Sequence, residues 1–325
     1  MNNARMVTEA MGSGKSDLLK DINAPHIDAP LVQAPNEINL SDRVSLVKLS
    51  ISLPNFNKVD KSATTELLHG KNAKAGVARV NKSIIAKEME ALKACRNCKT
   101  EMYNNHILLT QTYLDNVGWR TLCNEMIPRY IETICPLQDS FNARKEEFFI
   151  EYQWMREQMK DKLGDLFKES DYPHIDELRS KFGTTLSIEP MPNHGHWGID
   201  MSNDICKELV NDFKKRMGKA ENVMYKDIWS RLHERLTNMS NRLGEYDTKD
   251  NPQLYDTMVT HITDMADVMR HCNPMNDPSM DLARIEILDA MNGITKDGLK
   301  QSRSLREETK RNVDSIIANL PSIDI

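Results

Sequence analysis

Apolar residues recur every three or four positions from Ser202 to Gly244, and this stretch constrains the fold more than any other part of the chain. Charged residues fill many of the gaps, as expected for one buried stripe along a helix. Gly218 interrupts the pattern, so we expect two helical segments or one bent helix. The part from Ala220 to Leu243 alone would extend about 36 Å at 1.5 Å per residue, long enough to set the length of a bundle. The stripe residues are Leu209, Phe213, Met217, Ile228, Leu232, Leu236, Met239 and Leu243.

Other apolar periods predict shorter helices that can pack along this one. The clearest runs from Leu254 to Met269, where apolar residues step by 4, 4, 3 and 4 positions. The region 104–135 is less periodic, with Gly118, Pro128 and Pro136 as punctuation. Further helices are expected at 61–69, 82–103, 137–167, 171–182, 280–291 and 299–320.

Two short stretches alternate in the way of half-buried strands. The string VSLVKLSISL at 44–53 places Val47, Leu49 and Ile51 on one side and ends before Pro54. The string TTLSIEP at 184–190 alternates again. The simplest arrangement pairs these two strands in a small sheet beside a helical body.

Residues 1–42 differ from the rest, because they contain three Ala-Pro pairs and no sustained period. Repeated prolines keep such a segment extended. We therefore expect a flexible arm at 1–42, a helical region with a small sheet at 43–200, and a helical bundle region packed on it at 201–325. The predicted fold class is mainly α, an elongated helical bundle with a small β element.

Composition excludes several classes of protein. No run of eighteen apolar residues exists, which argues against a membrane-spanning helix, and the first seventeen residues lack the apolar core of a secretory signal. We expect a cytosolic protein whose six cysteines are reduced thiols. A net charge of −5 is too mild to indicate a nucleic-acid binder, so local clusters must decide that question.

Two motifs resemble known sites without completing them. The string GSGKS at 12–16 imitates the end of a phosphate-binding loop, but Glu9 stands where the motif needs its first glycine. Cys95 and Cys98 form a CxxC without the second ligand pair that a structural zinc site uses, and they fall inside a helical pattern. We assign no cofactor and no metal.

Histidines offer the most suggestive local chemistry. His194 and His196 flank Gly195 before Trp197, so the two imidazoles could share a metal or act as a base and its partner. The same turn reads equally as a strand-edge turn with Trp197 packed on the core. His271, beside Cys272 at a helix end, fits the helix dipole without any catalysis.

A basic run between residues 71 and 99 is stronger evidence for a binding site than the motifs above. It holds eight positive and two negative side chains, an excess of six, and could lie against phosphates or an acidic partner. It lacks the aromatic residues that stack on single-stranded bases, which favours a solvated face. The candidate nucleic-acid-binding residues are Lys71, Lys74, Arg79, Lys82, Lys87, Lys93, Arg96 and Lys99.

Five stretches together resemble an uncharacterised family encoded by tailed phages and prophages. They are ARVNKSII at 78–85, LGDLF with DYPHIDELRSKFG within 163–183, MYKDIWSRLHERLTNMSNRL at 224–243, CNPMNDPSMDLARIEILDAMNGIT at 272–295 and LREETKRNVDSIIANLP at 305–321. The resemblance covers roughly Leu46 to the end of the chain. The family has no established activity, so no residue inherits a role. Its genes can sit near those of MoxR-type AAA ATPases and von Willebrand A-type proteins, which implies a remodelling machine with adaptor subunits.

These observations lead to one expected function and three alternatives. We expect a non-enzymatic, phage-encoded adaptor or scaffold in the cytoplasm of the infected host, acting through helix faces on a protein partner such as an AAA ATPase complex, or on a second copy. The first alternative is a nucleic-acid-binding protein using residues 71–99. The second is a metal-dependent enzyme at residues 194–197. A virion structural protein also remains open.

Overall fold

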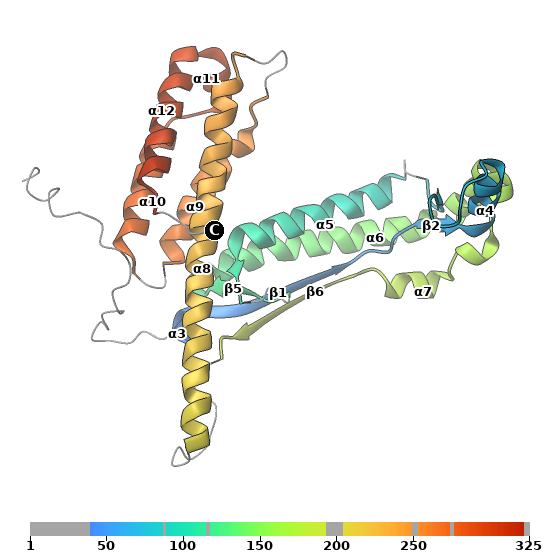
Figure 1. Ribbon diagram of the computed structural model, residues 1–325, viewed down its shortest axis with the longest axis horizontal. Coiled ribbons are helices and arrows are strands. Elements are labelled where there is room, and N and C mark those ends of the chain that lie inside the picture. The colour runs from blue at the N-terminus through green and yellow to red at the C-terminus, as the bar shows by residue number, and fades with distance from the viewer. Residues whose placement is uncertain are drawn as a thin grey trace, which may run out of the picture. The chain divides into compact units, whose positions relative to one another are not determined.

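The structure is a computed structural model that describes residues 40–86, 89–114, 118–192, 204–248, 253–273 and 276–321. Helices predominate, and a small antiparallel sheet accompanies them, which confirms the predicted fold class (Figure 1). The predicted arm lies outside the described residues except for 40–42, which belong to the short helix α3, Leu40–Arg43. The part of the chain that the structure describes contains no helix with the length and apolar character needed to cross a bilayer.

The sheet is built on the two strands that the sequence predicts. Strand β1, Val44–Ser52, pairs antiparallel with β6, Gly183–Pro190, from Ser45 opposite Pro190 to Ser52 opposite Gly183. The predicted alternation holds in the second half of β1, where Leu49 and Ile51 pack against a hydrophobic core. It fails in the first half, because Leu46 and Val47 are both buried although they point to opposite sides of the strand. Two strands that the sequence did not reveal complete the order β4-β5-β1-β6. They are β4, Gln111–Thr112, and β5, Arg120–Cys123, both too short to show an alternating pattern.

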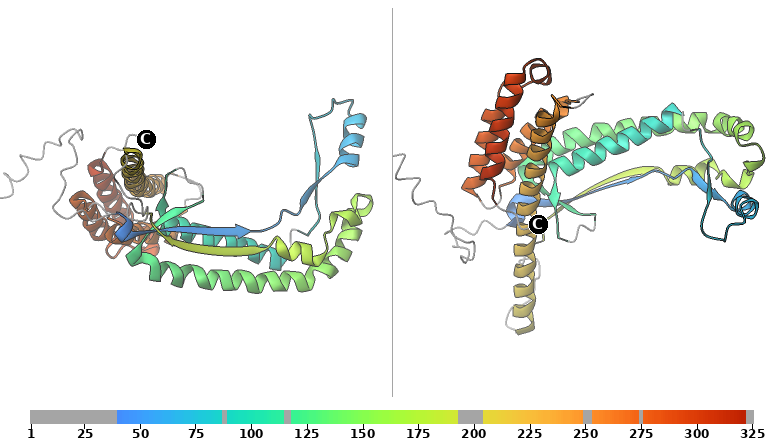
Figure 2. Two further views of the ribbon diagram at one scale, coloured as in Figure 1. Left: turned by 90° about the horizontal axis from the view of Figure 1, so that it is seen from below. Right: turned by 45° about the horizontal axis from the view of Figure 1, so that its top comes forward.

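Two long helices pack together beside the ribbon formed by β1 and β6 (Figure 2). They are α5, Glu90–Leu109, and α6, Ile127–Leu163, and the 3-10 turn η1, Asn124–Met126, leads into α6. The prediction that a helix begins near residue 137 was wrong. Pro128 lies in the first turn of α6, where no backbone donor is needed, and Pro136 lies inside the helix. Buried Ile134 and Phe141 anchor the helix on both sides of Pro136, so packing offsets the hydrogen bond that the proline removes.

A small hairpin unit occupies residues 57–83. Strand β2, Asn57–Asp60, pairs antiparallel with β3, Val80–Ser83, and helix α4, Lys61–Gly70, lies between them in the chain. The prediction that a helix begins at residue 82 was therefore wrong, because residues 80–83 form a strand that pairs with β2. The segment between α6 and β6 contains the 3-10 turns η2, Gly164–Leu166, and η3, Glu169–Asp171, and helix α7, Ile175–Ser180.

The remaining helices form a bundle around α8, Asp204–Glu245, which is one continuous helix through Gly218. Helix α8 packs against α9 and α12, and α10 packs against the same two helices. The single helix predicted at 299–320 is two, because Ser302 has an extended backbone and its hydroxyl accepts the Leu305 N–H at 3.2 Å, which caps a new helix. The other bundle helices are α9, Asp256–His271; α10, Pro278–Met291; α11, Lys296–Gln301; and α12, Arg303–Asn319.

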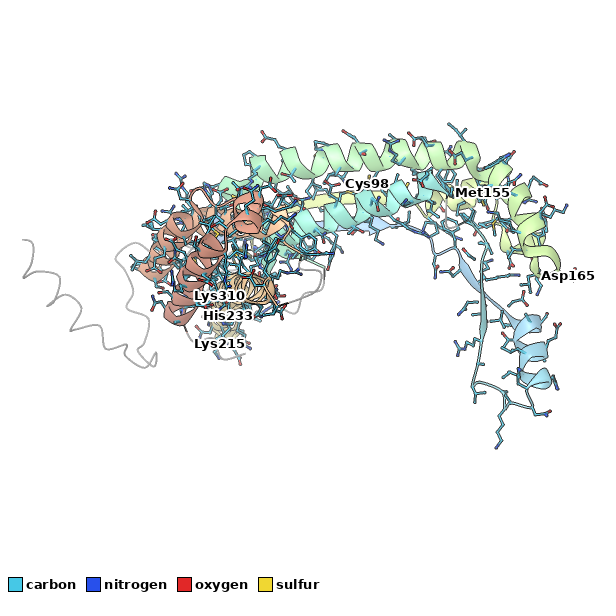
Figure 3. All side chains as sticks on the ribbon, turned by 90° about the horizontal axis from the view of Figure 1, so that it is seen from above. Cys98, Met155, Asp165, Lys215, His233 and Lys310 are labelled. Atoms are coloured by element: carbon cyan, nitrogen blue, oxygen red, sulfur yellow. The ribbon has the colours of Figure 1, made fainter. Side chains whose placement is uncertain are left out.

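The described residues bury two hydrophobic cores. The first core joins one end of the sheet to α8, α9, α10 and α12, and its buried side chains include Trp229, Leu232, Met265, Ile287 and Val313. The second core lies between α5, α6, α7 and the residues that flank the hairpin unit, Phe56, Ile84 and Ile85, and is rich in aromatic rings around Phe148. Met155, labelled on α6 in Figure 3, belongs to the second core. Leu49 of β1 packs against both cores.

A buried polar junction fixes the short strands to α8. Asp227 of α8 accepts hydrogen bonds from the backbone N–H of Thr112 at 3.2 Å and from its hydroxyl at 3.0 Å. The Arg231 guanidinium lies 3.1 Å from the same carboxylate and that of Arg120 lies 3.8 Å away. Arg120 also donates to the Thr110 hydroxyl at 2.6 Å. Such a network holds because each buried charge has an opposite charge beside it.

Candidate interaction surfaces

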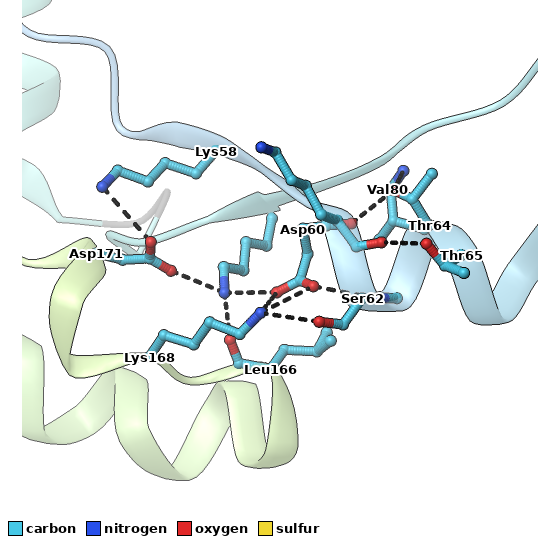
Figure 4. A network of polar contacts seen from close by, with 12 residues as sticks. Lys58, Asp60, Ser62, Thr64, Thr65, Val80, Leu166, Lys168 and Asp171 are labelled. Atoms are coloured by element: carbon cyan, nitrogen blue, oxygen red, sulfur yellow. Dashed lines mark hydrogen bonds and ion pairs between the residues drawn. The ribbon is translucent and has the colours of Figure 1, made fainter. Parts of the chain in front are cut away.

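The structure divides the predicted basic run into three environments. Lys82 of β3 is buried, and its ammonium lies 2.8 Å from Asp60 and 2.8 Å from Asp171 (Figure 4). It also donates to the Leu166 carbonyl at 2.5 Å, and Lys168 lies 3.2 Å from Asp60. Hydrogen bonding to Lys82 holds the pKa of the Asp60 carboxyl well below its usual range. Lys82 therefore ties the hairpin unit to the turns after α6 and contributes nothing to an exposed basic surface.

The connection between α4 and β3 carries the exposed part of the run. Lys71, Lys74 and Arg79 are exposed there, and no ion pair is described for any of them. Gly76 has a φ of 91°, a conformation that glycine adopts without strain, and Val77 beside it is 68% exposed. The hairpin unit stands apart from most of α5 in both views of Figure 2. Three like charges thus share one protruding connection.

The rest of the run lies on α5 or outside the described residues. Lys93 and Arg96 are exposed, and Lys93 pairs with Glu90 at 3.5 Å. Lys99 lines a groove of about 530 Å³ together with two further lysines and the carboxylates of Asp171 and Glu177. Lys87 is not among the described residues. The eight cations therefore do not form one continuous face.

The CxxC pair belongs to the second core. Cys95 is fully buried, and burial, followed by the nearby Cys98, raises the pKa of its thiol to about 11. Cys98, which is labelled in Figure 3, has its Sγ 3.5 Å from the Ser140 hydroxyl of α6. A protonated buried thiol is a poor metal ligand and a poor nucleophile. Among the described residues no three His, Cys, Asp or Glu side chains gather as a metal-binding group.

His271 and Cys272 lie at the end of α9, as predicted. His271 Nδ1 lies 3.0 Å from Glu125, and buried Cys272 accepts a hydrogen bond from Gln111 Nε2 at 3.4 Å. Contact with Cys272 and burial raise the pKa of the neighbouring Cys123 thiol. A cavity of about 330 Å³ beside them mixes two arginines and His271 with three carboxylates, so its charge selects no class of ligand. The predicted sites at 12–16 and 194–197 lie outside the described residues.

Helix α10 presents a regular apolar stripe on the described surface. Leu282, Ile285 and Leu288 are 62%, 48% and 41% exposed. They succeed one another every three residues, on the side opposite to Met280 and Ile287, which are buried in the first core. The sequence contained a signal for this stripe, because apolar residues in 280–291 exceed what one face of a helix can hold.

Another exposed apolar feature, a pair of side chains, lies on α6. Ile150 and Trp154 are 82% and 67% exposed and are separated by one turn. Acidic residues surround the pair, including Glu147 and Glu151. Two isolated apolar residues on a surface are common, whereas a stripe that extends over two turns more often marks an interface.

Comparisons of the chain with protein-family models, with curated proteins and with solved structures found no match.

Proposed function

We propose that this protein is a non-enzymatic adaptor or scaffold that binds a protein partner through the exposed face of α10. The observation that carries the proposal is the stripe of Leu282, Ile285 and Leu288 on a helix whose opposite face is already buried. Leaving such a face in water has no structural benefit for a bundle helix. A groove or helix of complementary shape would bury it without disturbing the first core.

The flanks of the stripe indicate the chemistry of the partner. Helix α10 carries Asp281, Glu286 and Asp289 against one cation, Arg284, a net charge of −2. The Arg284 guanidinium lies 4.0 Å from Asp281, so it is directed to its own helix. The complementary surface is an amphipathic helix with apolar residues three or four apart and basic residues at its edges.

The phage resemblance supplies the biological setting of this proposal. Adaptors of remodelling machines recognise another subunit by helix faces and need no catalytic group. A phage AAA ATPase or its associated subunit in the infected bacterial cytoplasm is accordingly the partner we propose to test first. An assembly factor or virion component would use the same surface chemistry.

The test is recovery of tagged protein from infected cells, with and without nuclease, followed by reconstitution with the purified companion. A defined companion should bind the wild-type protein directly, and Leu282→Asp with Ile285→Asp should weaken that binding by roughly a hundredfold or more, because two buried apolar side chains are lost. The matched control is Ile150→Asp with Trp154→Asp on α6, which should bind normally. Loss of binding only in the α6 variant would overturn the assignment to α10. Failure of every companion to bind the purified protein would overturn the adaptor function.

A second candidate function is nucleic-acid binding by the connection between α4 and β3. The specific observation is that Lys71, Lys74 and Arg79 are exposed together on a protruding segment. Phosphate contacts of this kind are independent of sequence and release counterions.

Fluorescence anisotropy with short DNA and RNA at several salt concentrations tests this candidate. Binding should weaken as the salt concentration rises. In Lys71→Glu with Lys74→Glu, the slope of the logarithm of the binding constant against the logarithm of salt concentration should become shallower by about 2, because about two phosphate contacts are lost. Lys93→Glu with Arg96→Glu on α5 is the matched charge control and should leave binding largely intact. Absent or salt-insensitive binding would remove this function.

A further inference from the structure

The first half of α8 extends beyond the core that holds the second half. From Glu208 to Lys219 every side chain is exposed or half-buried, and Ala220 is the first buried residue of the helix among those described. Figure 1 shows this part of α8 extending past the sheet, away from α9–α12. We refer to residues 208–219 as the α8 extension.

The α8 extension carries an apolar stripe of its own. Leu209, Phe213 and Met217 are spaced by four residues, so they lie along one face. Leu209 is 41% exposed, and neither it nor Phe213 packs into either of the two described cores, whereas Met217 lies at the margin of the first core. The stripe therefore continues the buried face of α8 beyond the side chains that cover it.

Charges are segregated along the same segment. Glu208 and Asp212 precede the middle of the extension, and Lys214, Lys215, Arg216 and Lys219 follow it. The one described ion pair within the extension joins Asp212 to Lys215 at 3.9 Å, and both side chains are mostly exposed. An exposed pair of this kind contributes little by itself, so the charges are available to a partner.

We propose that the α8 extension pairs antiparallel with the same segment of a second copy, about a two-fold axis near Phe213. This register places Leu209 opposite Met217 of the partner copy and the two Phe213 rings together. The acidic half of each helix then faces the basic half of the other, whereas a parallel pair would bring like charges together. An antiparallel pair also directs the two first cores to opposite ends of the paired segment.

This pairing is isologous and self-limiting. The same patch is used on both copies, so association closes at a dimer. A contact of about three helical turns buries less surface area than a standard stable interface, so the dimer should dissociate on dilution. The stripe on α10 is not used and remains free for another partner.

Sedimentation equilibrium of the full chain over a range of concentrations tests the proposal. The wild-type protein should show a monomer–dimer equilibrium, and Phe213→Asp should raise the dimer dissociation constant by roughly tenfold or more while leaving the circular dichroism unchanged. Leu282→Asp on α10 is the matched apolar-to-acid control and should not alter the constant. A monomer at all concentrations, or a dimer abolished by Leu282→Asp and not by Phe213→Asp, would overturn the proposal.

Charge exchange and crosslinking test the orientation. A basic variant, Glu208→Lys with Asp212→Lys, and an acidic variant, Lys214→Glu with Lys215→Glu and Arg216→Glu, should each be mostly monomeric and should associate when mixed. A photoreactive residue at position 209, in a mixture of isotopically heavy and light protein, should crosslink between copies near residue 217. Crosslinks between copies at position 209 itself would show a parallel pair and contradict this geometry.

Discussion

At the scale of single residues, His106 has an environment that couples stability to pH. It is 4% exposed, and its Nδ1 lies 2.7 Å from the Tyr130 hydroxyl. Burial, reinforced by the positive charge of Arg120, lowers the pKa of His106 to about 4 from an ordinary value of 6.5. The unfolded chain therefore binds a proton at a higher pH than the folded protein does. The contribution of His106 to stability is complete above the unfolded pKa and is lost as pH falls from about 6.5 to 4.

The free energy of unfolding in urea, measured at pH 7 and pH 5, checks this coupling. The wild-type protein should lose about 2 kcal/mol more than His106→Gln between these two pH values, because glutamine does not titrate. His69→Gln, at an exposed position, is the control and should keep the wild-type pH dependence. Equal pH dependence in His106→Gln and wild type would contradict the coupling.

Lys82 provides a second prediction at this scale. The substitution Lys82→Met removes the ammonium between the Asp60 and Asp171 carboxylates. Their negative charges then keep only the ion pairs of Asp60 with Lys168 and of Asp171 with Lys58. We expect a loss of about 3 kcal/mol, because breaking a buried pair leaves an uncompensated charge. The loss should appear as faster amide hydrogen exchange in α4 and β3. Lys93→Met, whose side chain is 60% exposed, should change exchange there very little.

The burial of Lys82 also shows what the sequence could not disclose about the basic run. Nothing in the local string around Lys82 distinguishes it from Lys71 or Arg79, because its partners come from β2 and from the turns after α6. Lys71, Lys74 and Arg79 are exposed because the connection between α4 and β3 is too short and too polar to form a core. Counting charges along the sequence therefore revealed the excess of positive charge in residues 71–99. Only the tertiary structure showed which of these charges are exposed and which are paired.

At the scale of elements, Gly218 offers a test of local propensity. It lies in the interior of α8, and a Cβ added there would meet no atom within 4 Å. Gly218→Ala should therefore raise the free energy of unfolding by up to about 1 kcal/mol, because alanine loses less conformational freedom in a helix. The contrasting variant is Gly293→Ala, where a φ of 72° should make the same change destabilising. Urea unfolding of both variants measures the two signs, and a destabilised Gly218→Ala would show that α8 needs flexibility there.

Element boundaries were predictable where one physical signal acts alone. The strands at 44–53 and 184–190 and the helix of 254–269 follow from clear periods, and their positions are confirmed. The prediction failed at Pro136, where buried neighbours keep a helix continuous, and at β4 and β5, which are stabilised by Asp227 and by pairing with β1. The excess of apolar residues in 280–291 indicates a second apolar face on α10, but helical periodicity alone does not say which of the two faces is buried.

At the scale of the whole described chain, two cores of unequal size are joined by continuous elements. Helices α8–α12 contribute buried side chains to the first core only, whereas α5 and α6 contribute them to both, and β1 adds half-buried Leu49 and Ile51 to the second. Helix α6 passes from the first core at Ile134 to the second at Phe141, and Pro136 lies between them. A helix that lacks one hydrogen bond at this point can open on one side without unfolding on the other. We therefore expect the second core to unfold as a unit while the first remains folded.

Phe148→Ala tests this division. Phe148 is fully buried, and its ring packs against Phe56, Phe149, Tyr152 and Phe182, so the truncation should cost about 3–5 kcal/mol within the second core. Amide hydrogen exchange should accelerate in α5, α7 and the second half of α6, and should stay unchanged in α8–α12. Leu232→Ala in the first core is the reciprocal variant and should accelerate exchange in α8–α12. If Phe148→Ala instead accelerated exchange uniformly, the two cores would be one cooperative unit, and a partner bound at α10 would stabilise the whole molecule and not the bundle alone.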